Sequence, residues 1–158
     1  MEPVIRRLQA GDERGWRELW GGYQAFYRAA IPAEVTALTF GRLLDHGGPF
    51  IGLVAEDGAR LQGLAHAVVT WSTWSASPSV YLNDLFVAAG AKRSGVGRKL
   101  VEAVYAEADR LGASQTWWLT HETNSRACVL YDKIAHRTGH IHYARDRKGP
   151  RPGGENDP

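Results

Sequence analysis

The chain has 158 residues and a mass of 17.4 kDa, which predicts one domain whose core is large enough to fold without disulfides or a structural metal. A single cysteine, Cys128, excludes an internal disulfide and a cysteine-based zinc site. The net charge of +2 is too small to indicate a nucleic-acid partner by itself, and no apolar run is long enough for a transmembrane helix. Residues 1–3 lack the basic and apolar build of a secretory leader, so we expect a cytoplasmic protein without a membrane partner.

Apolar periodicity and turn residues predict the element order β-α-α-β-β-β-α-β-α-β. Strands are expected over residues 3–8, 50–56, 60–71, 81–87, 114–120 and 138–145, and helices over residues 12–29, 32–46, 95–111 and 124–135. Asp12 is suited to cap the first helix, and Asp57 with Gly58 indicates a hairpin between the second and third strands.

The early strands are joined by hairpins, whereas the later strands alternate with helices. This arrangement predicts an α/β fold in which helices flank a mixed central sheet. We expect one domain over residues 1–145. Residues 146–158 hold three of the seven prolines and no large apolar side chain, so we expect a disordered tail there.

A basic turn that contains glycines, residues 92–99, joins a predicted strand to a predicted helix and carries four basic residues among its eight. Glycines let backbone N–H groups approach an anion closely, and a helix N-terminus is positive, so the turn is suited to hold a pyrophosphate. It is not a Walker A loop, because Val96 stands where that loop requires lysine. It is not a dinucleotide fingerprint either, because Leu100 replaces the third glycine. The alternative interpretation is a solvated basic helix start.

Two motifs, in this order, resemble those of the GNAT acetyltransferases. Residues 92–97 (KRSGVG) fit the first signature, which is Arg or Gln, two residues, Gly, one residue, then Gly or Ala, with Lys92 in the first position. Residues 124–131 (NSRACVLY) resemble the second signature, which is Asn, two residues, Ala, three residues, Tyr. The predicted element order resembles that fold over residues 3–145. The sequence is most similar to the branch with spermidine/spermine and yeast histone, polyamine and D-amino-acid acetyltransferases.

The resemblance implies acetyl-CoA as the co-substrate and no metal. It assigns the pyrophosphate to the basic turn, the pantetheine arm to the main chain of the preceding strand, and a contact further along the arm to Asn124. The implied cofactor-binding residues are Leu85, Phe86, Val87, Lys92, Arg93, Ser94, Gly95, Val96, Gly97, Arg98, Asn124 and Ala127. On the helix predicted over residues 124–135, Asn124, Ala127 or Cys128, and Tyr131 share one face because of their spacing.

The resemblance also implies that Tyr131 is the catalytic acid, which protonates the departing thiolate of coenzyme A. The general base stays open. In the polyamine branch a glutamate stands where this chain has Asn83, and an asparagine cannot accept a proton at neutral pH. Asp84 is adjacent, but strand alternation predicts that it lies on the opposite face. Further candidates are His121, Glu122, and a water molecule held by Asn83.

Trp71 and Trp74 belong to an uncharged loop that could form an apolar wall of the acceptor site or simply pack on the sheet. The predicted substrate contacts are Asn83, Asp84, Trp71 and Glu122. His140 and His142 have no evident third ligand, so we do not expect a metal site.

We therefore expect an acetyl-CoA-dependent N-acetyltransferase that acts on a primary amine of a small molecule or amino acid. Carboxylates near the expected acceptor site are few, which disfavours a polyamine. The competing hypotheses are an acetyltransferase for protein lysines or N-termini and a non-catalytic sensor that binds acyl-CoA. A homodimer is expected from the family resemblance alone.

Overall fold

The computed structural model describes residues 2–92 and 94–147, and the chain divides into two compact units, Met1–Trp118 and Leu119–Pro158. The first unit is built on a five-stranded sheet in the order β1-β2-β3-β4-β5. Its strands are β1 (Val4–Arg7), β2 (Phe50–Asp57), β3 (Arg60–Thr70), β4 (Ser79–Val87) and β5 (Gln115–Trp117). Neighbours are antiparallel from β1 to β4, and β5 runs parallel to β4.

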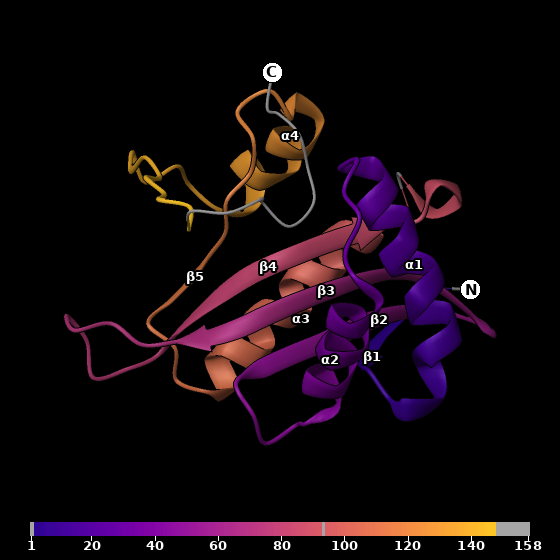
Figure 1. The fold of residues 1–158 in the computed structure, drawn as a ribbon. Coiled ribbons are helices and arrows are strands. Elements are labelled where there is room, and N and C mark those ends of the chain that lie inside the picture. The colour runs from indigo at the N-terminus through magenta and orange to yellow at the C-terminus, as the bar shows by residue number, and fades with distance from the viewer. Residues whose placement is uncertain (1, 93, 148–158) are drawn as a thin grey trace. The chain divides into compact units, whose positions relative to one another are not determined.

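Helices cover both faces of this sheet. Helices α1 (Glu13–Phe26) and α2 (Ala33–Leu44) lie on one face and α3 (Val96–Arg110) lies on the other (Figure 1). Two short 3₁₀ helices, η1 (Ala10–Asp12) and η2 (Ala89–Ala91), precede α1 and α3. The predicted α/β class with a mixed, helix-flanked sheet is confirmed. No helix in the described part of the chain is long and apolar enough to cross a membrane.

Apolar side chains from the sheet and from each helix layer form the core. On the side of α1 and α2 the buried cluster comprises Leu8, Trp16, Leu19, Trp20, Phe40, Leu43, Val54 and Leu64. Helix α3 buries a stripe at helical spacing that comprises Val96, Leu100, Val101, Val104 and Ala108. The apolar positions whose spacing predicted these helices are therefore the positions that are buried in the structure.

The second unit contains α4 (Ser125–Ile134), which lies inside the helix predicted over residues 124–135. The strand predicted over residues 138–145 was wrong: this described segment has no regular secondary structure. Its apolar side chains Ile141 and Tyr143 are 74% and 85% exposed, so its alternating pattern is not matched by a buried face. In the predicted tail, residues 148–158 lie outside the described residues.

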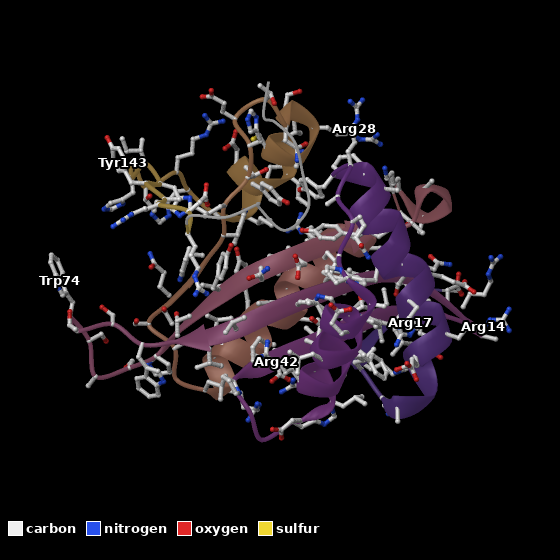
Figure 2. The ribbon with its side chains drawn as sticks, viewed as in Figure 1. Arg14, Arg17, Arg28, Arg42, Trp74 and Tyr143 are labelled. Atoms are coloured by element: carbon white, nitrogen blue, oxygen red, sulfur yellow. The ribbon has the colours of Figure 1, made fainter. Side chains whose placement is uncertain are left out.

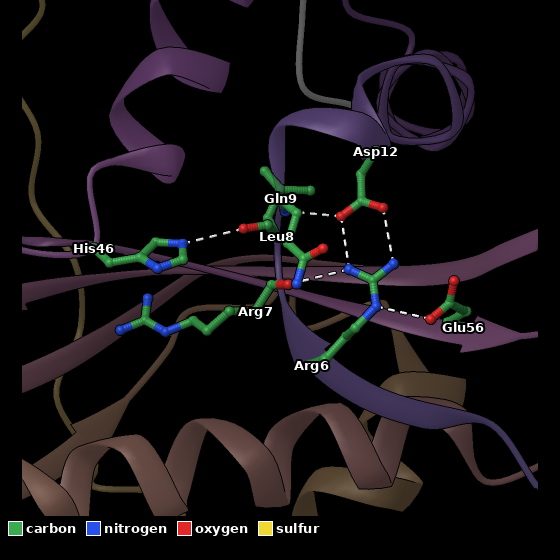
Figure 3. A network of polar contacts seen from close by, with 7 residues as sticks. All are labelled: Arg6, Arg7, Leu8, Gln9, Asp12, His46 and Glu56. Atoms are coloured by element: carbon green, nitrogen blue, oxygen red, sulfur yellow. Dashed lines mark hydrogen bonds and ion pairs between the residues drawn. The ribbon is translucent and has the colours of Figure 1, made fainter.

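Strand β1 is tied to its neighbours through the guanidinium of Arg6, which Figure 3 shows between two carboxylates. Arg6 donates from Nη1 and Nη2 to the two carboxylate oxygens of Asp12, at 2.7 and 2.8 Å, and from Nε to Glu56 at 2.8 Å. Asp12 also accepts the backbone N–H of Gln9 at 2.8 Å. Asp12 is the N-cap of α1, as predicted, but in the described structure its carboxylate makes no capping bond to that helix.

We expect Asp12→Asn to lower the free energy of unfolding by about 1–2 kcal/mol near neutral pH, because charge-assisted hydrogen bonds to a largely buried carboxylate are lost. Hydrogen bonds from Arg6 lower the pKa of Asp12. A carboxyl group with a lowered pKa stabilises the fold above its unfolded pKa, and this stabilisation is lost as the pH falls through the folded pKa.

The variant should therefore lose less stability than the parent on acidification to about pH 3. Denaturant unfolding near neutral pH and at low pH measures the free energy of unfolding of both proteins. The control is Glu18→Gln, because that side chain is 68% exposed and forms only a 3.5 Å ion pair with Arg14. Parallel pH dependences of parent and Asp12→Asn would contradict the prediction.

Candidate active site

The predicted pyrophosphate site is a turn between η2 and α3. Gly95 is the N-cap of α3 and has a φ of 80°, a left-handed conformation that favours glycine. A glycine N-cap has no side chain that could accept from the first-turn N–H groups of Val96, Gly97 and Arg98, so these groups can serve an anion. The Ser94 hydroxyl donates to the Ala91 carbonyl at 2.6 Å and fixes the turn from within. Arg93 lies outside the described residues.

The basic side chains described around this turn already have partners. Arg98 donates to Glu102 at 2.7 Å, and Lys99 donates to Glu2 at 2.8 Å. The ammonium of Lys92 lies 5.6 Å from the centroid of the Phe26 ring at the end of α1. This arrangement favours backbone N–H groups over lysine and arginine side chains as the donors that would hold an anion here.

Strand β4 leaves part of one edge unpaired by β5. The three residues of β5 pair only with Ser79, Val80 and Tyr81, while β3 pairs along β4 as far as Val87. Beyond Tyr81, no other strand of the described chain pairs with β4 on the β5 side. The predicted pantetheine contacts Leu85, Phe86 and Val87 are the last residues of β4. Such an edge can accept an extended arm as an added strand.

A β-bulge interrupts β4 between the paired edge and these last residues. His66 of β3 pairs with Asp84 and the next residue, Ala67, pairs with Leu82, so Asn83 is the extra residue. The Asn83 amide donates to the Asp84 carboxylate at 3.2 Å. The prediction that alternation separates these two side chains was therefore wrong, because a bulge breaks the two-residue period.

The Asp84 carboxylate lies in a small network against α1. It accepts from His66 Nδ1 at 3.0 Å, and the side chains of His66 and Asp84 are 5% and 13% exposed. The phenol of Tyr23, on α1, interacts electrostatically with Asp84. Burial, followed by the negative charge of Asp84, raises the pKa of Tyr23, and the same two causes raise the pKa of Tyr27 and Tyr81. One carboxylate thus acts on three tyrosines.

Trp71 and Trp74 lie in the loop from β3 to β4, which precedes Ser79 at the start of β4, whereas the basic turn follows the other end of that strand. They are 73% and 97% exposed, and Figure 2 shows Trp74 projecting into solvent. Their role as a wall of the acceptor site stays a prediction.

The remaining predicted site residues belong to the second unit. Asn124 is the N-cap of α4 and Ala127 lies in its first turn, whereas Tyr131 lies two turns along. Glu122 is exposed in the turn before α4. In the same turn His121 Nδ1 accepts the backbone N–H of Thr123 at 3.2 Å. Among the described residues, no group of three His, Cys, Asp or Glu side chains could hold a metal ion.

Sequence reasoning did not single out His66. The available signal was a lone histidine flanked by apolar residues, because buried polar groups are hydrogen-bonded and so have a partner. That partner, Asp84, is 18 residues away in the sequence.

Comparison with known proteins shows the family of this chain. The sequence pattern of the Acetyltransferase (GNAT) family matches residues 15–136. The chain is 38% identical over 146 residues to the D-amino-acid N-acetyltransferase HPA3 of Saccharomyces cerevisiae, a match that covers 90% of each protein. It is 30% identical over 142 residues to the uncharacterized N-acetyltransferase YhfO of Bacillus subtilis, covering 88% of this chain and 94% of that protein.

A solved structure shares the fold at lower sequence identity. AAC(6′)-Iy in complex with a CoA-based bisubstrate analogue matches with a TM-score of 0.81 at 18% identity, over 93% of this chain and 99% of that chain. The family match and the two relatives confirm the identity inferred from the two motifs. The chain belongs to the GNAT family of acetyl-CoA-dependent N-acetyltransferases.

Proposed function

We propose that this enzyme acetylates the primary amine of an amino acid or of a similarly small molecule, and that Asp84 receives the amine. The observation that carries the proposal is a largely buried carboxylate at the β4 bulge, held by His66 at 3.0 Å and near three tyrosines. A carboxylate attracts an ammonium group, and the faces of aromatic rings do the same. Because the bulge directly precedes the unpaired edge of β4, an amine at Asp84 would lie beside the last part of the acetyl-CoA arm.

In the proposed reaction the amine nitrogen attacks the thioester carbonyl carbon, the C–N bond forms, and the C–S bond breaks. The nitrogen must shed a proton, and it becomes far more acidic as it bonds to carbon, so a carboxylate can accept that proton. Asp84 has this role in the proposal. Tyr131 donates a proton to the departing thiolate.

Acetyl-CoA is held, in the proposal, by the residues that the family motifs indicate. Backbone N–H groups of residues 94–98 bind the pyrophosphate, and Lys92 and Arg93 add positive charge. The main chain of Leu85, Phe86 and Val87 pairs with the pantetheine arm, and Asn124 and Ala127 contribute further along it.

An amino-acid acceptor also brings a carboxylate, and we propose that Arg28 binds it. Arg28 follows α1, is exposed and next to Tyr27, and projects beyond the end of the helix in Figure 2. Its φ of 51° is left-handed, where most helices place a glycine. An arginine here costs about 1 kcal/mol of stability relative to glycine. A side chain that meets the substrate would account for that cost.

We expect Arg28→Gly to raise the free energy of unfolding by about 1 kcal/mol, because glycine adopts this φ without strain. Its kcat/KM for amino acids should fall about tenfold or more, since a charge-assisted hydrogen bond is lost. Amines without a carboxylate should react as in the parent. Arg14→Ala is the control with the same change of charge, because that side chain is 94% exposed on α1. An equal loss for both classes of amine would contradict the prediction.

Release of the coenzyme A thiol in the presence of an amine panel tests the proposed function. The panel comprises D- and L-amino acids, the matching amines without carboxylate, polyamines and lysine peptides. We expect small amines with one positive charge to react best. Turnover with peptides alone would indicate a protein acetyltransferase. Binding of acetyl-CoA without thiol release would indicate a sensor.

A cytoplasmic location and a homodimer also stay proposals. Sedimentation of the purified protein tests the second of them.

A further inference from the structure

We infer that His66 is a positioning residue for Asp84: Trp16 fixes the neutral imidazole so that its Nδ1–H points at the carboxylate. The inference rests on the proposed function, because it concerns the group that receives the amine. His66 lies on β3, directly opposite the bulged part of β4. Neither motif of the family contains it.

The hydrogen bonds determine which nitrogen of His66 carries the proton. Trp16 Nε1 lies 2.9 Å from His66 Nε2, and an indole nitrogen can only donate. His66 Nε2 therefore accepts and carries no hydrogen. The ring hydrogen is on Nδ1, which lies 3.0 Å from Asp84 Oδ2 and donates to it. The contact is a hydrogen bond from a neutral ring to a carboxylate rather than an ion pair.

Packing keeps the imidazole in this orientation. His66 is 4% exposed and its ring centroid lies 5.8 Å from that of Trp16 and 5.2 Å from that of Trp20. Trp16 is fully buried and stacks on Trp20 with centroids 5.7 Å apart. A second proton on Nε2 would have to displace the donor of the fully buried Trp16. The ring therefore cannot act as the base itself, and it cannot turn its donor away from Asp84.

Within residues 2–92 and 94–147, the other groups found to interact with Asp84 are neutral as well. Helix α1 contributes Tyr23, its C-cap is Tyr27, and β4 contributes Tyr81 and Asn83. An arginine or lysine in the place of His66 would also orient the carboxylate, but it would cancel its charge. A neutral donor orients Asp84 and leaves its full negative charge available to an ammonium group.

Two substitutions of His66 separate this role from a merely structural one. In His66→Asn the side-chain amide can take the place of Nδ1–H and donate to Asp84, whereas His66→Leu has no donor. We expect kcat/KM to fall about tenfold or more in His66→Leu, with unchanged acetyl-CoA affinity by calorimetry. The acid limb of its pH profile should move to higher pH, because a carboxylate that has lost a donor takes up a proton more readily. His66→Asn should recover most of both properties.

A spectroscopic measurement on the intact parent keeps the inference falsifiable if His66→Leu does not fold. The ¹⁵N shifts of the His66 ring should show a protonated Nδ1 and an unprotonated Nε2 at neutral pH. Trp16→Phe removes the donor to Nε2, so a second tautomer with the proton on Nε2 should appear and kcat/KM should fall. An imidazolium, or a proton on Nε2, in the parent at neutral pH would overturn the inference.

The outcomes also distinguish the inference from the function on which it rests. If the parent acetylates amines and folded His66→Leu matches it in kcat/KM and pH profile, His66 is structural and the inference is wrong, while the proposed function stands. If the parent binds acetyl-CoA but releases no thiol with any amine, the proposed function fails, and the inference falls with it whatever the tautomer.

Discussion

Replacement of Asp84 by asparagine is expected to lower kcat/KM for small amines by about 10²–10³, which is within the range for loss of a general base. Asparagine has the shape of aspartate, and its carbonyl oxygen can still accept from His66 Nδ1, so the bulge and its network should persist. It has no negative charge to attract an ammonium, and it cannot accept the proton that the nitrogen sheds. Acetyl-CoA affinity should stay as in the parent, because the cofactor contacts proposed on β4 are backbone groups.

Steady-state kinetics over a range of pH measure this effect. The rate of Asp84→Asn should still rise with pH, because only the neutral amine attacks and its pKa lies near that of lysine, about 10.4. The matched control is Asp109→Asn, which makes the same chemical change on the exposed face of α3. If the activity of Asp84→Asn stays within a few-fold of the parent, another group is the general base. His121 and Glu122, in the second unit, would then be the groups to test by substitution.

The structure changes the interpretation of Asn83, which stands where the polyamine branch has a glutamate. The sequence has Asn83 in the place of a glutamate, which by itself favours a protein without a base. The bulge brings the neighbouring carboxylate of Asp84 to within 3.2 Å of the Asn83 amide. A carboxylate is therefore present at this point of β4, one residue later in the chain. Its presence supports catalysis over a sensor role.

Local patterns predicted most of the first unit because the relevant physics is local. The Asp57–Gly58 hairpin forms as expected, with Gly58 at a φ of 62°. The apolar stripe predicted for α3 is also the face that this helix buries. The segment 138–145 shows the limit of such patterns, since alternation is compatible with a strand only where a neighbouring strand and a buried face exist. Neither of these conditions can be read from the segment itself.

The site was harder to predict because its chemistry depends on distant partners. Asp12 matches a helix cap, yet Arg6 competes for its carboxylate from β1. The bulge at Asn83 cannot be read from the β4 sequence SVYLNDLFV, because the adjacent polar pair would also fit opposite faces of a regular strand. The protonation state of His66 follows from Trp16, which lies 50 residues earlier in the chain. The cofactor motifs were recognisable because each is contiguous, whereas the acceptor network is assembled from three elements.

Removal of the Tyr131 hydroxyl should lower turnover by about 10²–10⁴, the usual contribution of a general acid. Tyr131→Phe keeps the ring and its packing on α4, so the fold and acetyl-CoA affinity should be nearly unchanged. The thiol of coenzyme A resembles that of cysteine, with a pKa of about 8.5, so an unassisted thiolate can leave, though more slowly. The loss should therefore appear in kcat rather than in KM, because protonation of sulfur matters only once the C–S bond is breaking.

The second unit offers a matched control, Tyr143→Phe. It removes the same hydroxyl from a side chain that is 85% exposed and that Figure 2 shows pointing into solvent. Thiol release at saturating acetyl-CoA and amine compares the two variants directly. If both turn over within a few-fold of the parent, Tyr131 serves packing alone and the thiolate departs unaided. If Tyr131→Phe loses kcat and acetyl-CoA affinity together, the hydroxyl contributes to binding, and the proton must come from another donor or from water.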